Sequence, residues 1–217
     1  MIKPSEISMS CNEHSFDDFD FSECRFLYLL NFNPKSGSFG ELPDMPMLSK
    51  LEIHLTNARD FSGLDKFPFL TELTVTNCRR LSSYDGIEKL DFLKYLFIEN
   101  ARKLCGHENA AYPKCLETLA LINCGAMQSI DFISSMDSLT DFRFYGTDCL
   151  SGDLLPLTVH EPPLEFTSFS NKRYYSHKLY QVYELIGRTD LIEYSDRIKN
   201  MKPQQQRVAC IHDKNVL

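Results

Sequence analysis

Six segments of the chain repeat one spacing of apolar residues at a nearly constant interval. The segments are LYLLNF, LSKLEI, LTELTVTNCRRL, LKYLFIENARKL, LETLALINCGAM and LTDFRFYGTDCL. Their first residues are Leu27, Leu48, Leu70, Leu93, Leu116 and Leu139, so the successive steps are 21, 22, 23, 23 and 23 residues. Self-similarity at such a period is typical of units that cannot bury their apolar face alone. We therefore expect a stack of similar units.

The shared spacing L-x-x-L-x-L is that of a short strand. Alternate side chains of a strand point to opposite faces, so the leucines face inward and the residues between them face outward. Cys78 and Cys124 stand eight places after the first leucine, where the chain is expected to leave the strand. The next inward residues are predicted to be Leu81, Leu104, Met127 and Leu150. In the second segment Asn57 and Phe61 come two places late, which predicts a bulge there.

The full pattern L-x-x-L-x-L-x-x-C-x-x-L resembles the leucine-rich-repeat family over roughly residues 24–170. This resemblance implies an α/β solenoid with a parallel β-sheet on its concave face and with short helices, 3₁₀ turns and loops on its convex face. The stretches 82–92 and 129–138 carry apolar residues at helix-like spacing, which favours short helices or 3₁₀ turns there. Both open ends of such a stack need a cap, because terminal repeats expose apolar edges.

The sequence predicts one structural domain with four parts. We assign 1–23 to an N-terminal cap, 24–170 to about six to seven repeats, 171–202 to a C-terminal capping segment with a helix, and 203–217 to a tail. The capping helix is predicted over 176–188, with Ser176 as its N-cap. Its apolar side is predicted to consist of Leu179, Val182, Tyr183, Leu185 and Ile186.

Composition limits the kinds of partner. The 217 residues carry 23 Lys and Arg against 30 Asp and Glu, a net charge of -7, which argues against nucleic acid because no excess of cations is available to release counterions. No apolar run approaches the roughly 20 residues that a membrane span needs, and no signal peptide is recognisable. The eight cysteines are scattered without a CxxC pair. These features predict reduced thiols and a cytoplasmic location.

The sequence offers little for catalysis or for metal binding. Its histidines and cysteines show no zinc-ligand spacing, and the nearest candidate is Cys105-Gly106-His107. Phosphate loops, nucleophile elbows and dinucleotide fingerprints are all missing. We therefore expect no cofactor, no metal and no enzymatic activity. An enzyme that uses a cysteine and a distant histidine is the alternative from another class, and no motif supports it.

The outward residues of the strands supply a binding surface instead. In its middle lie Tyr95, Phe97, Ile122 and Tyr145, where solubility would favour polar residues. An apolar, aromatic centre with a charged rim is typical of a protein interface. The residues predicted to contact a protein partner are Glu52, His54, Glu72, Thr74, Tyr95, Phe97, Glu99, Ile122, Asp141, Arg143 and Tyr145. In the first repeat the outward residues are predicted to be Leu29, Asn31 and Asn33. The alternative is that the C-terminal segment or a flanking loop folds over this patch and buries it within the same chain.

A second cluster, FTSFSNKRYYSHKL (166–179), gathers basic and aromatic residues. Such a cluster can bind nucleic acid, but its place before the capping helix favours a role in the cap. Followed by a short helix, it also resembles small bacterial leucine-rich-repeat immunity proteins of polymorphic or contact-dependent toxin systems. That resemblance implies a chain, monomeric when unbound, that occludes a cognate toxin, and the acidic balance suits a cationic toxin domain. The alternatives are a regulatory scaffold and a secreted effector that binds a cellular protein.

Overall fold

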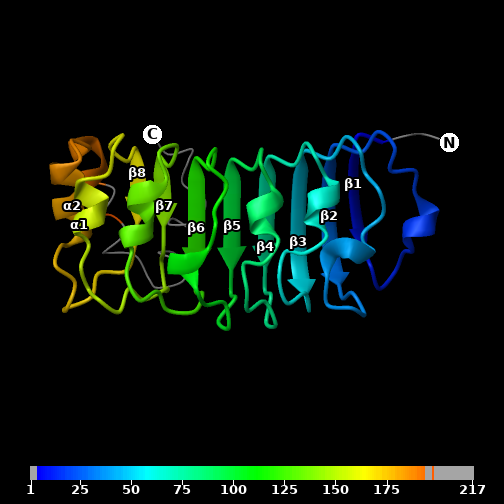
Figure 1. Ribbon diagram of the computed structural model, residues 1–217, viewed down its shortest axis with the longest axis horizontal. Helices are drawn as coiled ribbons and strands as arrows, with labels where there is room; N and C mark the ends of the chain where they lie inside the picture. The colour runs from blue at the N-terminus through cyan, green and yellow to red at the C-terminus, as the bar shows by residue number, and fades with distance from the viewer. Residues whose placement is uncertain (1–3, 194–196, 198–217) are drawn as a thin grey trace.

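A computed structural model describes residues 4–193 and residue 197. Its eight strands form one parallel sheet in which every strand pairs with its neighbours in the chain (Figure 1). The strands are β1 (Glu6–Ser10), β2 (Phe26–Phe32), β3 (Lys50–Thr56), β4 (Glu72–Thr76), β5 (Tyr95–Glu99), β6 (Thr118–Ile122), β7 (Asp141–Arg143) and β8 (Phe166–Ser168). Short helices accompany the sheet along one side, so the expected leucine-rich-repeat solenoid of the α/β class is confirmed.

The inward positions of neighbouring strands are aligned by the register of the sheet. Leu51 pairs with Leu73, Leu73 with Leu96 and Leu96 with Leu119, and all of them are fully buried. Because the side chains of a strand alternate, this register places the same face of every strand against the core. Leu27 belongs to this column, since it pairs with Leu51.

This pairing corrects the predicted position of the first repeat. Leu27 stands opposite Leu51, so Cys24, which is fully buried, takes the place that Leu48 holds in the next repeat. Leu29, predicted to face outward, is buried, and Tyr28 faces outward in its place. The steps from Cys24 to Leu48 and onward are again close to 23 residues.

At or near the end of most strands stands a residue with a positive φ angle, seven places after the first inward residue. These residues are Asn31, Leu55, Asn77, Asn100, Asn123 and Gly146. The buried residue that follows is Cys78 in the third repeat and Cys124 in the fifth, in agreement with the expectation. The predicted bulge in the second repeat is wrong: β3 pairs in register up to Thr56, and Phe61 stacks on Tyr84, so it takes the place of Tyr84 in the repeat and not that of Leu81. The prediction that Leu150 faces inward is also wrong: Leu150 is exposed, and the neighbouring Cys149 is buried in its place.

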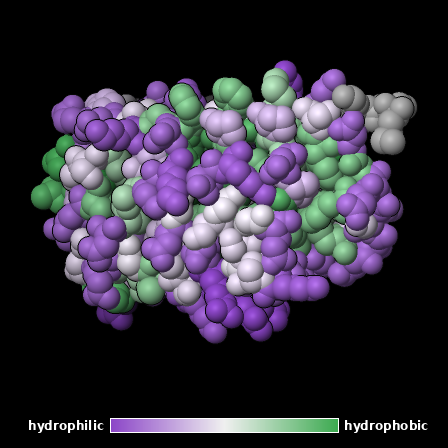
Figure 2. Space-filling model, turned by 45° about the vertical axis from the view of Figure 1, so that its right-hand side comes forward, coloured by the Kyte–Doolittle hydropathy of each residue, from purple (hydrophilic) through white to green (hydrophobic). Residues whose placement is uncertain are grey.

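Short 3₁₀ helices occupy the returning limbs. They are η1 (Phe16–Asp18), η2 (Phe39–Glu41), η3 (Leu64–Lys66), η4 (Ile87–Lys89), η5 (His107–Asn109), η6 (Asp131–Ser135) and η7 (Thr189–Leu191). The helices η4 and η6 lie within the two stretches predicted to contain them. Most of the surface seen from this side and from the N-terminal end is hydrophilic, with separate apolar patches (Figure 2).

A continuous series of aromatic rings runs through the core. Successive ring centroids lie between 5.1 and 6.4 Å apart. In order, the rings belong to Phe16, Phe32, Phe39, Phe61, Tyr84, Tyr112, Phe132, Phe142, Phe144, Phe169 and Tyr175. These separations suit attractive ring pairs, so each repeat is joined to the next by more than its strand.

At the N-terminal end the sheet begins earlier than the repeat pattern indicated. Strand β1 lies within the segment assigned to the N-terminal cap, and its Ile7 and Met9 are buried. Phe21 is buried just before β2, and Phe16 and Phe19 pack partly against the core. The segment 1–23 therefore contains a complete strand as well as capping residues.

At the C-terminal end lie α1 (Leu155–Thr158) and α2 (Leu179–Leu185). Helix α2 starts later than predicted, with Lys178 and not Ser176 as its N-cap residue, and the Ser176 hydroxyl accepts from the Leu154 N–H at 2.9 Å. Leu179, Val182 and Tyr183 are buried as expected, whereas Leu185 is 58% exposed. Most of the predicted segment beyond 193, including the tail 203–217, lies outside the described residues. No helix in the described part of the chain is long and apolar enough to cross a membrane.

Candidate functional site

The outward side chains of the sheet form three rows across the concave face. The first row contains Phe26, Lys50, Glu72, Tyr95, Thr118, Asp141 and Phe166; the second contains Tyr28, Glu52, Thr74, Phe97, Ala120, Arg143 and Ser168; the third contains Leu30, His54, Thr76, Glu99 and Ile122. We call the part over β2–β5 the open half and the part over β6–β8 the buried half, because their exposure to solvent differs.

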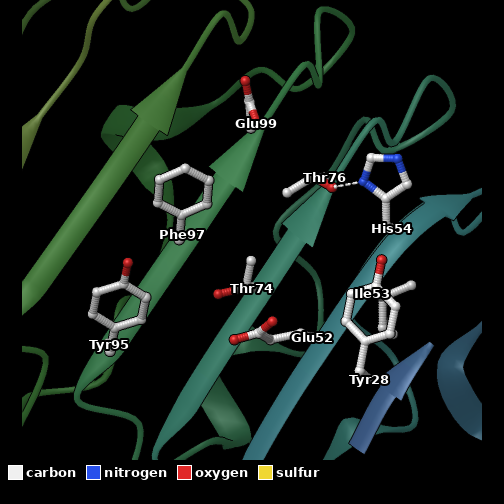
Figure 3. A pocket seen from close by; sticks show the side chains of 9 residues that line it. All are labelled: Tyr28, Glu52, Ile53, His54, Thr74, Thr76, Tyr95, Phe97 and Glu99. Carbon is white, nitrogen blue, oxygen red and sulfur yellow. Dashed lines mark hydrogen bonds between the residues drawn. The ribbon is translucent and has the colours of Figure 1, made fainter. Parts of the chain in front are cut away.

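The open half contains a hollow with a volume of about 300 Å³. Its lining residues, shown in Figure 3, are Tyr28, Glu52, Ile53, His54, Thr74, Thr76, Tyr95, Phe97 and Glu99. They come from four successive strands, β2 to β5, so the hollow exists only because the strands stack in register. Aromatic rings contributed by β2 and β5 flank the threonines and Glu52 between them, and Glu99 lies at the end of β5.

One edge of the hollow is held by a polar ladder. His54 Nδ1 lies 2.7 Å from Thr76 Oγ1, and the Asn77 amide nitrogen lies 3.4 Å from both ring nitrogens of His54. Asn100 donates to Asn77 at 2.8 Å, and Asn123 donates to Asn100 at 3.3 Å. Each link joins one repeat to the next, so the ladder fixes the side chains at the rim of the site.

The other edge carries charge. Lys50 Nζ lies 3.0 Å from Glu52 and 3.5 Å from Glu72. Burial lowers the pKa of Lys50, but the two carboxylates outweigh it and leave the pKa above its ordinary value. Tyr95 lies next to this group, and burial raises the pKa of its phenol. Lys50 is therefore cationic and Tyr95 neutral at physiological pH.

In the buried half, the outward side chains are nearly inaccessible except for that of Phe166, which is half-buried. Ile122 is fully buried, and with Phe97 and Ala120 it forms an apolar cluster separate from the core, against which Tyr95 and Tyr145 pack. Such burial is not expected from strand alternation, which places these residues on the outer side of the sheet. The predicted patch of Tyr95, Phe97, Ile122 and Tyr145 thus exists as a physical cluster.

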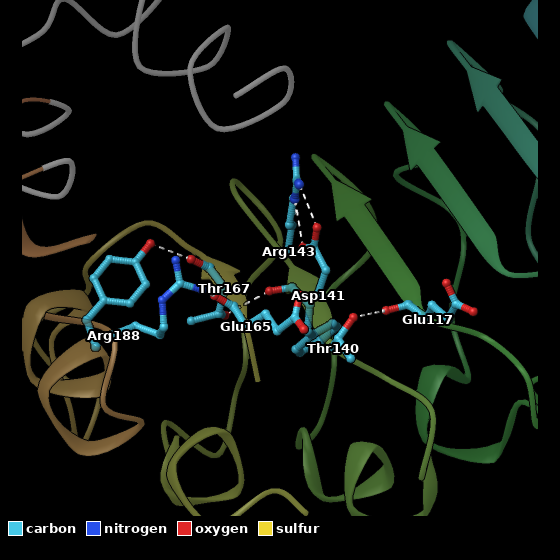
Figure 4. A network of polar contacts seen from close by, with 9 residues as sticks. Glu117, Thr140, Asp141, Arg143, Glu165, Thr167 and Arg188 are labelled. Atoms are coloured by element: carbon cyan, nitrogen blue, oxygen red, sulfur yellow. Dashed lines mark hydrogen bonds and ion pairs between the residues drawn. The ribbon is translucent and has the colours of Figure 1, made fainter. Parts of the chain in front are cut away.

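Next to this cluster lies a buried ion pair. Arg143 donates to Asp141 through Nε at 2.8 Å and through Nη2 at 2.6 Å, and the two residues are 3% and 5% exposed (Figure 4). The Arg143 guanidinium also lies 4.7 Å from the centre of the Phe166 ring. A bidentate pair of this kind is orienting as well as attractive.

The eleven predicted contact residues therefore fall into two groups. The structure brings six of them together in the hollow, namely Glu52, His54, Thr74, Tyr95, Phe97 and Glu99. Glu72 is exposed beside it. Ile122, Asp141 and Arg143 are buried and do not line the hollow, so we leave them out of the candidate site; Phe97 is equally buried but contributes to the lining, and Tyr145 is half-buried against the apolar cluster. The alternative in which the C-terminal segment covers this patch involves residues that lie largely outside the described ones.

The prediction missed one aromatic residue of the hollow. Tyr28 was overlooked because the first repeat was aligned on Leu27 instead of Cys24. The signal was present in the sequence, since Asn31 stands as far after Cys24 as Asn77 stands after Leu70. Aligning the asparagines would have placed Tyr28 in the same row as Glu52.

The remaining candidate groups have structural partners. The ring nitrogens of His107 lie 2.7 Å from the Tyr84 hydroxyl and 3.0 Å from the Gly125 carbonyl, so His107 is engaged on both sides. The Tyr175 hydroxyl accepts from the Cys149 N–H at 3.0 Å, and Tyr175 is buried, in keeping with a capping role for 166–179. Burial raises the pKa of the Cys124 thiol to about 12, and that of Cys78 is also raised. Within the described ranges, no group of three or more His, Cys, Asp or Glu residues could hold a metal ion.

Comparisons with known proteins agree with this fold. No protein-family model and no curated protein matches the sequence. Among solved structures, the chain is similar to an internalin from Listeria monocytogenes, with a TM-score of 0.51 over 76% of this chain and 15% sequence identity. The chain spans 59% of the length of that internalin chain. At this identity the likeness shows the fold alone, a leucine-rich-repeat solenoid.

Proposed function

We propose that this chain is a protein-binding leucine-rich-repeat module, rather than an enzyme, and that it holds its partner on the open half of the concave face. The observation that carries this proposal is the hollow on that face, in which Tyr28 and Tyr95 flank polar residues and carboxylates. Half-exposed tyrosines surrounded by charge are the typical anchors of protein interfaces.

A finer proposal concerns the partner. The carboxylates of Glu52, Glu72 and Glu99 and the net charge of -7 favour a cationic protein surface. A cognate cationic toxin domain would suit this charge, and the chain would then be a cytoplasmic immunity protein, monomeric when unbound, that blocks the toxin by covering it. A regulatory scaffold or a secreted effector with a cellular partner is the alternative use of the same surface.

The test compares three forms of the full chain as bait in native lysate. The site variant carries Tyr28→Ala and Tyr95→Ala. The matched control carries Phe69→Ala and Phe92→Ala, which remove two aromatic rings that are 57% and 61% exposed and do not line the hollow. All three forms are first shown to melt cooperatively, so that loss of binding is separated from loss of folding.

We expect the wild type and the control to retain one protein in common and the site variant to lose it. Truncating an aromatic anchor commonly weakens binding by about 2 kcal/mol or more, which is roughly thirtyfold. If the control loses the partner and the site variant keeps it, the concave face is not the binding surface. A toxin domain as the retained protein, with its activity blocked by the wild-type chain, would support the immunity proposal, and a cellular protein would favour the scaffold.

A further inference from the structure

The concave surface over β6–β8 is almost closed to solvent, although strand alternation turns it outward. Ala120 and Ile122 of β6 are 1% and 0% exposed, and Arg143 of β7 is 3% exposed. The 3₁₀ helices of the repeats, η2 to η6, lie on the other side of the sheet, and α1 and α2 lie at its C-terminal end (Figure 1). No helix among the described residues therefore covers this surface.

Ser168, an outward residue of β8, gives a second indication of an additional neighbour. Its side chain is fully buried, and its hydroxyl has no hydrogen-bond partner among the described residues. A buried hydroxyl normally has such a partner. The surface therefore requires a neighbour that brings apolar side chains to Ala120 and Ile122 and a polar group to Ser168.

The last described elements of the chain lie beside this surface. The Tyr183 hydroxyl of α2 donates to the Thr167 carbonyl of β8 at 2.7 Å, and the Arg188 guanidinium donates to the Glu165 carbonyl (Figure 4). Leu191 of η7 is buried. The chain is thus held at the last strand up to η7, and the residues that follow start from the edge of the surface.

The sequence beyond Arg197 has a composition that suits such a neighbour. Residues 198–217 carry four Lys and Arg and one Asp, so the net charge of -7 divides into -10 for 1–197 and +3 for 198–217. A segment of opposite net charge is attracted to the rest of the chain. Its longest apolar run is VACI (208–211), which lies among polar residues. The segment therefore offers both the apolar and the polar groups that the surface requires.

We propose that residues 198–217 fold back over β6–β8 of their own chain, with 208–211 against the apolar cluster of Phe97, Ala120 and Ile122. The length of the segment allows this, because β6 lies about 10 Å from β8 at the strand spacing of a sheet, whereas the chain from 198 to 208 can span up to about 33 Å. Phe97 also lines the hollow, so the segment borders the candidate site. Resting on the proposed function, the segment confines a protein partner to the open half.

The test is an NMR experiment on the full chain with ¹³C-labelled methyl groups of Ala, Ile and Val. We expect nuclear Overhauser contacts between the methyl groups of Ile122 or Ala120 and those of Val208 or Ile211, since such contacts arise only between groups that are close in space. Sedimentation at the same concentration should show a monomer. A dimer in which these contacts join differently labelled chains would assign the surface to a second copy and overturn the proposal.

Two variants of the segment separate its apolar run from its charge, after both are shown to melt cooperatively. Ile211→Asp brings a carboxylate to the apolar cluster, so the contacts of Val208 with Ile122 and Ala120 should be lost and binding of the apolar dye ANS should rise. Gln205→Asp changes the net charge equally at a polar position, and should keep both readouts at the wild-type level. Contacts that survive Ile211→Asp would contradict the placement of 208–211.

The two proposals can fail separately. If the wild type shows no contact between 198–217 and the methyl groups of Ile122 and Ala120, while Tyr28→Ala and Tyr95→Ala abolish capture of the lysate partner, the proposed function stands and the folded-back segment is ruled out. If the contacts are present and capture does not depend on Tyr28 and Tyr95, the segment covers β6–β8 and the proposed function fails.

Discussion

Asn100 and Asn77, equivalent residues of adjacent repeats, are joined by a hydrogen bond in which the Asn100 amide donates to Asn77 Oδ1 at 2.8 Å. Both residues have a positive φ, 58° and 57°, which asparagine tolerates better than other residues with a side chain. One residue type thus turns the chain off the strand and ties that turn to the next repeat. Asparagine contributes both the positive φ and the side-chain hydrogen bond, and different substitutions remove one or both of them.

We expect Asn100→Ala to destabilise the protein by about 2–3 kcal/mol, because alanine is strained at a positive φ and cannot form the ladder. Asn100→Gly also loses the hydrogen bonds of the ladder, but glycine adopts the positive φ without strain, so this variant should cost about 1 kcal/mol. Urea unfolding measures both values. Equal costs for the two variants would show that the turn geometry contributes nothing at this position.

Gly146 occupies the same turn position in the sixth repeat, with φ 72°. A Cβ atom there would lie 2.1 Å from Asn123 Oδ1, so Gly146→Ala must displace the ladder as well as strain the backbone. Gly106 is the matched control: its φ is 76° and nothing lies within 4 Å of an added Cβ. We expect a cost of about 1 kcal/mol for Gly106→Ala and clearly more for Gly146→Ala, measured by urea unfolding. Similar values would mean that Asn123 moves aside freely.

The buried pair of Arg143 and Asp141 predicts a non-additive response. Arg143→Met leaves the Asp141 carboxylate buried without its partner and should cost about 3–5 kcal/mol. The double variant Asp141→Leu, Arg143→Met removes both charges and should cost less than the single variant. A double-mutant cycle by denaturant unfolding checks this. If the double variant is the least stable of the set, packing by these side chains matters more than their charges.

His107 predicts a loss of stability in mild acid. Its Nε2–H donates to the Gly125 carbonyl, its Nδ1 accepts from the Tyr84 hydroxyl, and burial lowers its pKa below the ordinary 6.5. The unfolded chain then binds a proton that the folded chain does not bind, so the stability contributed by this histidine is present above pH 6.5 and declines as the pH falls through that value.

Thermal melts from pH 7.5 to pH 5.5 measure this effect. We expect His107→Gln to lower the melting temperature at pH 7.5 but to make it less dependent on pH than in the wild type. His14→Gln, at an exposed histidine of the N-terminal segment, is the control and should keep the wild-type slope. An unchanged slope in His107→Gln would show that another group causes the acid response.

The period of the repeats, together with the leucine-rich-repeat resemblance of their pattern, was enough to predict the fold, because each strand pairs with the strand one repeat away and the inward leucines mark both. It was not enough to align the first repeat, since Cys24 takes the place of a leucine there and Leu27 imitates the start of the pattern. Leucine positions are thus a less reliable guide at the ends of the stack. The position of Asn31 is a better guide, because the turn after the strand requires a residue that tolerates a positive φ.

The candidate site was predicted only in part for a different reason. Strand alternation tells which side of the sheet a residue faces, and it placed Glu52, Tyr95 and Arg143 correctly on the concave side. It says nothing of how open that side is at each point. Arg143 is almost inaccessible, while Tyr95, two strands away, borders the hollow.

The order of the strands has a consequence for synthesis of the chain. Every strand pairs with the strands next to it in sequence, and paired residues are 20 to 25 positions apart, from Glu6 and Phe26 at one end to Asp141 and Phe166 at the other. Each repeat can pair with the one before it without contacts to distant parts of the chain. The repeats can therefore fold one after another during synthesis, and at each stage only the most recently formed repeat exposes its apolar edge.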